Sequence, residues 1–274
     1  MEEQAPFIYR SFSSDGTSSE AALLKAAFDG NLDRIKGVMK SLGIPNSERA
    51  AVFSFTMGGF GVLHCAACQG HLEVCKYLVE ELGGDPNMSG GEGEDQVEGV
   101  TPFMASAQSG DISTVKYLFD HGGDLMKPDT KGRTVLHHAV CSGSSTVTEF
   151  LLSKGIPVDI DYGFGTPLYH ACINEQDKTV KILLNHHANP NTISCGIGTP
   201  LNGALIYRSL KCMKLLIKAS IFLDSFCLLP LCWLFFCLLK PSGPVFPRFS
   251  KLYCAILLTG NSCELAIAAK ECLA

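Results

Sequence analysis

Four side chains of types that bind zinc, His64, Cys65, Cys68 and His71, lie within a single short stretch of the chain. The spacing of His64, Cys68 and His71 places these three on one face of a helix, and Cys65 with Cys68 forms a Cys-x-x-Cys pair. A structural zinc site needs four ligands, and the sequence holds no second Cys-x-x-Cys pair to complete one. We therefore expect no metal site and no cofactor, and keep a metal-binding or enzymatic role around residues 64–71 as a minor alternative.

Paired histidines are the other residues that could act as general acids or bases. They are His137 with His138 and His186 with His187, and neither pair comes with a sequence signature for a nucleophile. Gly-x-Gly sequences begin at residues 59, 91, 163 and 196, but none has a third glycine at the dinucleotide-binding spacing. No Walker loop, kinase signature or Gly-x-Ser-x-Gly elbow is present. We expect a protein without catalytic residues or a small-molecule substrate, and so not an enzyme.

Composition restricts the class of binding partner and the cellular compartment that we expect for this protein. The 274 residues include 22 basic and 27 acidic side chains, a net charge of -5, which gives no basic field for nucleic acid. The first twenty residues have neither a basic start nor an apolar run, so they do not resemble a secretory signal. The 13 cysteines are then expected to be reduced and largely buried. We expect a cytoplasmic or nuclear protein that does not bind nucleic acid.

An internal sequence repeat predicts the helices that would position any functional site. Four openings of the type Thr-Pro-Leu-His recur every 32 or 33 residues, and a fifth lies 40 residues upstream. The first residues of these openings are Gly61, Thr101, Thr134, Thr166 and Thr199. A repeat of this length is the signature of a stacked array of small units, each unable to fold alone.

Within each unit, equivalent positions share the same chemistry. The third residue of each opening is bulky, and a small residue follows three positions later: Leu63 and Ala66, Phe103 and Ser106, Leu136 and Ala139, Leu168 and Ala171, Leu201 and Ala204. Apolar residues then recur 14, 17 and 18 positions after the start, as in Val115, Leu118 and Phe119. That i, i+3, i+4 spacing predicts a second amphipathic helix after a short, alanine-lined first helix.

Nine positions after each start the chain must turn between the two helices. Gly70, Gly110 and Gly143 occupy this position, where glycine adopts the left-handed conformation without strain. Glu175 and Arg208 replace glycine in the last two units. We therefore expect irregular or strained turns in those two units.

The period and the Thr-Pro-Leu-His-like openings resemble the ankyrin repeat. The resemblance implies an all-α ankyrin-repeat solenoid of stacked helix-turn-helix units with hairpin-like fingers, in an array of about five units over residues 59–219. Residues 18–58 resemble a divergent first repeat or amino-terminal cap, and we expect residues 1–17 to be disordered. The array with its long acidic finger is also similar to that of plant ankyrin proteins carrying tetratricopeptide repeats, although no tetratricopeptide pattern follows here. Under the resemblance, the opening histidines His64 and His137 bond to the threonine and the backbone.

The resemblance further implies a scaffold or adaptor that binds partner proteins through its concave surface and fingers. The most distinctive finger carries an insertion around residues 89–98 with four acidic and no basic residues. Two interpretations stay open: the insertion contacts a basic patch on a partner protein, or it is a solvated flexible loop. We expect contacts from the fingers, around residues 87–98, 127–133, 159–164 and 191–197, and from exposed positions of the first helices. The candidate contact residues are Asn87, Glu92, Glu94, Asp95, Glu98, Met104, Lys127, Asp129, Lys131, Arg133, His138, Asp161, Tyr162, Phe164, Tyr169 and Asn191.

The composition changes abruptly after Ala219, inside a unit. Residues 221–239 form an apolar run interrupted only by Asp224, Ser225 and Pro230, and residues 220–274 do not fit the repeat. Nineteen residues are just enough to span a bilayer as a helix. Three interpretations stay open: a translated non-coding stretch, a transmembrane helix that anchors the array with its repeats in the cytosol, and a buried or partner-facing helix.

Overall fold

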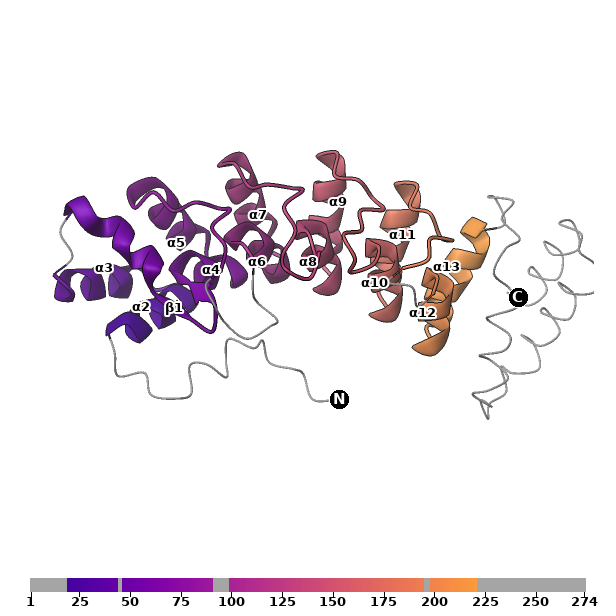
Figure 1. Ribbon diagram of the computed structural model, residues 1–274, viewed down its shortest axis with the longest axis horizontal. Coiled ribbons are helices and arrows are strands. Elements are labelled where there is room, and N and C mark those ends of the chain that lie inside the picture. The colour runs from indigo at the N-terminus through magenta and orange to yellow at the C-terminus, as the bar shows by residue number, and fades with distance from the viewer. Residues whose placement is uncertain (1–18, 44–45, 91–98, 195–197, 221–274) are drawn as a thin grey trace, which may run out of the picture.

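The computed structural model describes residues 19–43, 46–90, 99–194 and 198–220. In this part of the chain, helices follow one another in pairs along an elongated row (Figure 1). The pairs are α2 (Ser19–Phe28) with α3 (Leu32–Ser41), α4 (Val62–Cys68) with α5 (Leu72–Lys76), α6 (Pro102–Ser109) with α7 (Ile112–Asp120), α8 (Val135–Cys141) with α9 (Ser145–Ser153), α10 (Pro167–Ile173) with α11 (Asp177–Asn185), and α12 (Pro200–Ile206) with α13 (Leu210–Ser220). We call α2, α4, α6, α8, α10 and α12 the first helices, and their partners the second helices.

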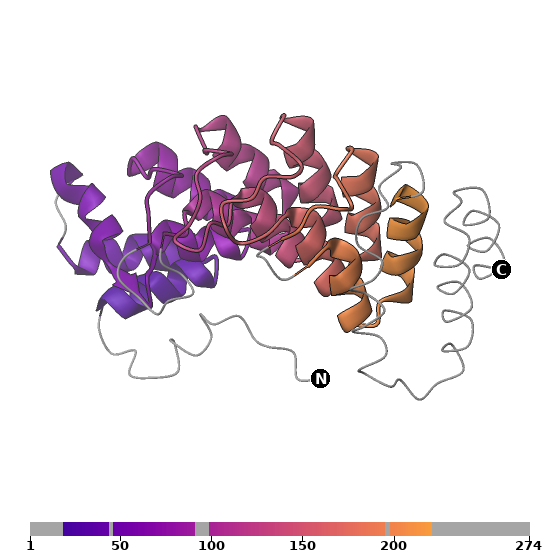
Figure 2. The same ribbon diagram turned by 45° about the vertical axis from the view of Figure 1, so that its right-hand side comes forward.

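Few other elements occur in the described residues. A 3-10 helix, η1 (Asn46–Ser54), precedes a two-stranded antiparallel hairpin of β1 (Thr56–Met57) and β2 (Phe60–Gly61), in which Met57 pairs with Phe60. The helix α5 continues as a π-helical turn, η2 (Tyr77–Glu81). Seen after a turn of 45°, the row keeps its two layers, with each first helix beside the next (Figure 2).

The first helices start where the sequence openings predict. Thr101 caps α6, because its hydroxyl oxygen accepts a hydrogen bond from the backbone N–H of Met104 at 3.2 Å. Thr166 caps α10 in the same way, and both helices have proline at the first turn, where its missing N–H has no intrahelical partner to lose. These caps set the register of each unit on the next.

The core is built from the equivalent positions of each unit. The leucines at position 17 of the repeat, Leu78, Leu118, Leu151, Leu183 and Leu216, are all fully buried, as are the small residues at position 5. The small residues let first helices approach each other closely, and each unit covers the apolar face of its neighbour. The predicted i, i+3, i+4 face is therefore the packing face of the second helices.

The turn between the two helices is left-handed in every one of these five units. Gly70, Gly110 and Gly143 have φ values of 73°, 75° and 76°, and Glu175 and Arg208 have φ values of 57° and 58°. A side chain in this region is strained, because Cβ crowds the following carbonyl oxygen. The strain predicted for the last two turns is confirmed.

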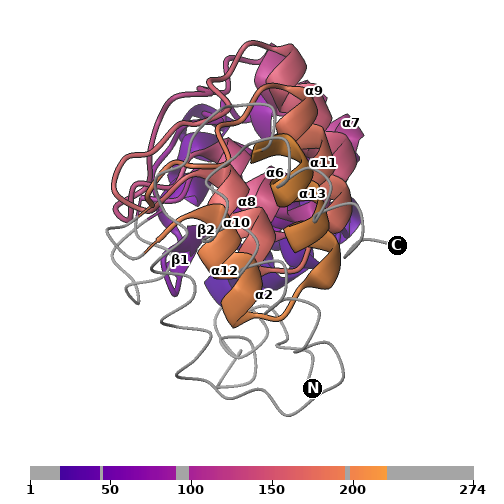
Figure 3. The same cartoon turned by 90° about the vertical axis from the view of Figure 1, so that its right-hand side faces the viewer.

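The loops that connect one unit to the next gather on one side of the helices (Figure 3). We call these loops the fingers, residues 82–101, 121–134, 154–166 and 186–199. The amino-terminal segment 1–17, the acidic insertion at residues 91–98 and the tail after residue 220 lie outside the described residues. Among the helices that the structure describes, none combines the length and the apolar character needed to cross a bilayer.

Candidate protein-binding surface

The opening histidines are structural, as the resemblance to the ankyrin repeat implies. The Nδ1 atom of His137 accepts a hydrogen bond from the backbone N–H of Thr134 at 3.1 Å, and its Nε2 lies 2.8 Å from the carbonyl oxygen of Gly165. His64 makes the same pair of contacts, with Gly61 N and with the carbonyl oxygen of Val100. Each ring thus links the start of a first helix to the finger of the next unit. Burial lowers the pKa of both rings to about 4, so both are neutral near pH 7.

The other members of the zinc-like cluster are also engaged elsewhere. The His71 Nε2 atom lies 2.8 Å from the carbonyl oxygen of Phe28, and the Cys68 thiol lies 3.2 Å from the carbonyl oxygen of Cys65. Burial raises the pKa of the Cys68 thiol to about 12, which keeps it protonated. Nowhere in the described residues do three or more histidine, cysteine, aspartate or glutamate side chains form a group that could hold a metal ion.

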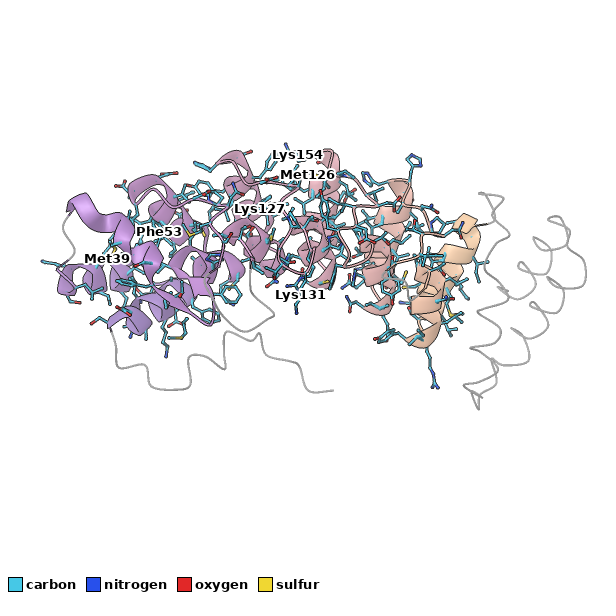
Figure 4. All side chains as sticks on the ribbon, in the orientation of Figure 1. Met39, Phe53, Met126, Lys127, Lys131 and Lys154 are labelled. Atoms are coloured by element: carbon cyan, nitrogen blue, oxygen red, sulfur yellow. The ribbon has the colours of Figure 1, made fainter. Side chains whose placement is uncertain are left out.

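Successive fingers are joined by hydrogen bonds. The Asn87 side chain donates to the carbonyl oxygen of Gly122 and accepts from the backbone N–H of Asp124, both at 2.8 Å. The Lys127 ammonium donates to the carbonyl oxygen of Asn87 at 2.7 Å. Two of the candidate contact residues, Asn87 and Lys127, therefore tie fingers together. Figure 4 shows Lys127 in the second finger, close to Met126.

Asp129 organises the second finger from inside. Its Oδ1 atom accepts hydrogen bonds from the backbone N–H groups of Lys131 and Arg133, at 2.9 and 2.8 Å. Its Oδ2 atom accepts from Arg133 Nε at 2.6 Å and lies 3.3 Å from His138 Nε2. Burial raises the pKa of this carboxyl group, but His138, the Arg133 backbone N–H and the Arg133 charge outweigh that effect and hold the pKa at about 2.

Three expected contact positions on the first helices are not exposed. Met104 and His138 are 0% and 1% exposed, and Tyr169 is 9% exposed. Met104 and Tyr169 are the fourth residues of their openings, which face the neighbouring unit rather than solvent. His138 lies between Asp129 and Gln108, whose amide nitrogen is 2.8 Å from His138 Nδ1. The expected exposure of these three residues is wrong, because packing between units covers them.

Two further candidates, Arg133 and Phe164, form a stacked group with His170. The Phe164 ring stacks on the His170 ring, with centroids 4.1 Å apart and planes 7° apart. The Arg133 guanidinium also lies over the Phe164 ring, with its carbon atom 5.5 Å from the ring centroid. Arg133 and Phe164 are only partly exposed, and Asp129 is 5% exposed. Their first role is to hold the second and third fingers together.

The remaining candidate contact residues differ in their solvent exposure. Lys131, Asp161 and Tyr162 are exposed at the finger tips, with Tyr162 at 49%, and Asn191 is half-buried. Asp161 also accepts the backbone N–H groups of Gly163 and Gly165 at 2.7 and 2.9 Å. The four acidic candidates, Glu92, Glu94, Asp95 and Glu98, lie outside the described residues.

Six large apolar side chains are exposed in the described residues, and three of them lie on fingers. Met126, Tyr162 and Ile193 lie on three successive fingers, at 40%, 49% and 57% exposure. Ile206 and Tyr207 lie at the end of α12, at 42% and 51%, and Leu210 at the first residue of α13. Among the described second helices before α13, no large apolar side chain is this exposed. This apolar surface is the strongest candidate for a partner contact.

Part of this surface was not predicted from the sequence. Met126, Ile206 and Tyr207 were not among the candidates, and neither were the exposed first-helix residues Gln108 and Cys141. Helical periodicity contains the necessary signal. The residues two and five positions after the start of each opening are buried or half-buried. Residues about two positions further along the helix, such as Gln108 and Cys141, therefore point away from the core.

The comparison with protein families agrees with this architecture. The family model for ankyrin repeats (3 copies) matches residues 63–162 and 157–226, more than half of the chain. The chain belongs to the ankyrin-repeat family. The predicted all-α ankyrin solenoid is thereby confirmed, and ankyrin repeats are in general modules for interactions between proteins.

Similar ankyrin sequences occur within much longer proteins. The chain is 32% identical over 99 residues to the Ankyrin and armadillo repeat-containing protein of Mus musculus. It is 30% identical over 146 residues to the Inactive serine/threonine-protein kinase TEX14 of the same organism. These alignments cover 36% and 53% of this chain but only 6% and 9% of the relatives. The similarity to the Putative palmitoyltransferase ZDHHC13 of Danio rerio is 27% over 161 residues, covering 55% of this chain and 22% of that protein.

A solved ankyrin structure has the same arrangement of units. The human ASB11 ankyrin repeat domain superposes with a TM-score of 0.59 and 27% sequence identity, over 72% of this chain and 82% of that chain. The similarity therefore extends over most of the ankyrin array, whereas it covers only a small part of the full-length relatives.

Proposed function

We propose that this ankyrin protein is a scaffold or adaptor that binds a partner protein across the tips of its second, third and fourth fingers and the exposed ends of its first helices. The observation that carries the proposal is the presence of an exposed large apolar side chain on each of three successive fingers, Met126, Tyr162 and Ile193. Tyrosine is one of the side chains that supply much of the binding energy at protein interfaces.

The rigidity of the fingers supports this function. Hydrogen bonds join Asn87 to the second finger, Thr166 N to Ser194 Oγ at 3.1 Å, and Asn189 N to the Asp159 carboxylate at 3.1 Å. Because these loops are already ordered by their neighbours, the fingers lose less conformational entropy when a partner binds them. Charged groups at the tips, Lys131 and Asp161, supply the polar rim.

The test is a quantitative affinity capture with two matched variants of the full chain. Tyr162→Ser with Ile193→Ser removes the two most exposed finger side chains among the apolar set, whereas Thr146→Ala with Glu149→Ser changes exposed residues of α9. We expect the finger variant to lose most of its bound proteins, and the α9 variant to keep them. Unchanged capture by the finger variant contradicts the proposal.

The acidic finger gives a second contact of the same function. Neutralising Glu92, Glu94, Asp95 and Glu98 to glutamine is expected to remove partners with basic contact patches and to leave the others. Identical sets of captured proteins from the parent and the neutralised chain would refute a role for this finger.

A second candidate function is that of a membrane-attached ankyrin protein, supported by the apolar run 221–239 of the sequence. Extraction at alkaline pH tests it in cells that express the full chain. Retention in the membrane pellet supports a spanning segment, and release into the wash refutes it.

A further inference from the structure

The outer surface of the array changes charge from one end to the other. Three positions of the repeat, 12, 15 and 19 residues after each start, place exposed or partly exposed side chains along one face of each second helix. In the three earlier units these positions carry Glu73, Lys76 and Glu80, then Ser113, Lys116 and Asp120, then Thr146, Glu149 and Ser153. Charges of the two signs are mixed there, and Lys76 pairs with Glu73 at 2.8 Å.

The last two units differ from this pattern. The same positions carry Lys178, Lys181 and Asn185 on α11, and Lys211, Lys214 and Lys218 on α13. All five lysines are exposed. We call these five residues the lysine face. Five lysines without an acidic residue in these positions stand out in a chain whose net charge is -5.

The lysines form one surface because α11 and α13 pack side by side. On each helix the lysines are three or four residues apart, which aligns them on a single side. Of these five lysines, only Lys211 has an ion pair within the described residues, at 3.7 Å from Asp177, and both side chains of that pair are well exposed, at 79% and 42%. Such an exposed pair contributes little energy and leaves the positive charge of the surface available.

We infer that the lysine face of α11 and α13 docks on the surface of a membrane that contains anionic lipid. Lysine ammonium groups are hydrated point charges that suit a diffuse layer of phosphate and carboxylate groups, whereas precise recognition of one acidic side chain favours arginine. Basic side chains near an anionic leaflet each strengthen binding about fivefold.

The position of this surface in the chain favours a lipid partner over an acidic protein. The last described residue of α13 is Ser220, and in the sequence the apolar run begins at the next residue, Ile221. Attachment to a membrane generally takes two signals, such as an apolar segment and a basic patch. Here the two are adjacent. The inference goes beyond both candidate functions above, because it does not require residues 221–239 to span the bilayer.

The experiment measures which lysines a membrane protects from chemical acetylation. The full chain is synthesised in a cell-free reaction with vesicles of phosphatidylcholine, either alone or mixed with phosphatidylserine, and then treated with a water-soluble acetylating reagent. Mass spectrometry compares Lys178, Lys181 and Lys214 with Lys25, Lys40 and Lys131, which are exposed elsewhere in the structure. We expect slower acetylation of the first group by at least about threefold, only in vesicles with phosphatidylserine.

Matched variants separate the lysine face from charge in general. Replacement of Lys178, Lys181 and Lys214 by glutamine is expected to lower the salt-sensitive binding to phosphatidylserine vesicles by about tenfold or more, relative to replacement of Lys25, Lys40 and Lys131. Equal acetylation in the two kinds of vesicle overturns the inference. Equal protection by soluble polyglutamate at the same charge concentration also overturns it, in favour of an acidic protein partner.

Discussion

At the scale of single residues, Asp129 shows how a finger keeps its shape. One carboxylate accepts two backbone N–H groups and the Arg133 side chain, and it lies beside the buried His138 ring. A buried carboxylate that is fully hydrogen-bonded stabilises a loop, whereas its removal leaves several donors without partners. Asp161 has a comparable role in the third finger, but it is exposed to water.

This contrast gives the first prediction. We expect Asp129→Ala to lower the free energy of unfolding by about 2 kcal/mol, and Asp161→Ala by less than about 1 kcal/mol, because water replaces the lost acceptor only at Asp161. Thermal denaturation followed by circular dichroism measures the difference. Trypsin should also cleave at Lys131 and Arg133 faster in the Asp129 variant; equal cleavage of both variants would argue against the role of this carboxylate.

The left-handed turns give a prediction with the opposite sign. Glu175 has a φ of 57° at a position that glycine occupies in earlier units, and its side chain is exposed. Glu175→Gly should therefore stabilise the protein by about 0.5 to 1 kcal/mol, since relief of strain exceeds the entropy gained by the unfolded chain. Glu149→Gly, on the exposed side of α9, should destabilise it by about 1 kcal/mol. A lower melting temperature for Glu175→Gly would contradict this explanation.

At the scale of elements, the fourth residue of each opening decides how a first helix joins the next finger. His137 makes this connection through hydrogen bonds on both ring nitrogens, whereas the apolar Met104 side chain is buried in the hydrophobic core. The two side chains are both fully buried, so they can be compared directly. The same position of the repeat is therefore polar and hydrogen-bonded in one unit and apolar in another.

We expect His137→Leu to destabilise the protein by about 2 kcal/mol, because the Thr134 N–H and the Gly165 carbonyl lose a buried partner. Met104→Leu conserves volume and leaves no polar group unsatisfied, so its cost should stay below about 1.5 kcal/mol. Denaturation midpoints in urea compare the two. If both changes cost the same, the hydrogen bonds of His137 do not contribute as inferred.

At the scale of the whole molecule, four buried histidines make stability depend on pH. Burial lowers the pKa values of His64 and His137 to about 4, and lowers those of His138 and His170 as well. Unfolded histidine titrates near pH 6.5, so the unfolded chain binds more protons between pH 6.5 and 4. The stabilising contribution of these neutral rings is therefore complete above pH 6.5 and is lost as the pH falls towards 4.

The melting temperature should accordingly fall between pH 6.5 and 4, with His64 and His137 each contributing up to about 3 kcal/mol. The buried carboxylate of Asp129, with its pKa near 2, adds a further loss only below about pH 4. A variant with His64→Leu and His137→Leu should show a flatter dependence above pH 4, even though it is less stable. An equally steep dependence in that variant would show that other groups titrate in this range.

Much of the architecture could be predicted from the residues in order along the chain. The spacing of the openings, the alanine of the first helices and the leucine at position 17 depend on local helical geometry, which repeats identically in each unit. The strain at Glu175 and Arg208 was predictable for the same reason, since a turn that needs glycine in three units needs the same φ in the others. The structural role of His64 and His137 followed from the family resemblance and their place in the opening.

The exposure of the contact residues depended on tertiary structure. Met104 and Tyr169 are covered by neighbouring units, and His138 by Asp129 and Gln108, residues that the fold brings to it from two other elements. The lysine face likewise becomes one surface only when α11 packs beside α13. Local sequence determines which side of a helix is apolar, but burial also depends on what packs against the other sides, and those partners lie some thirty residues away along the chain.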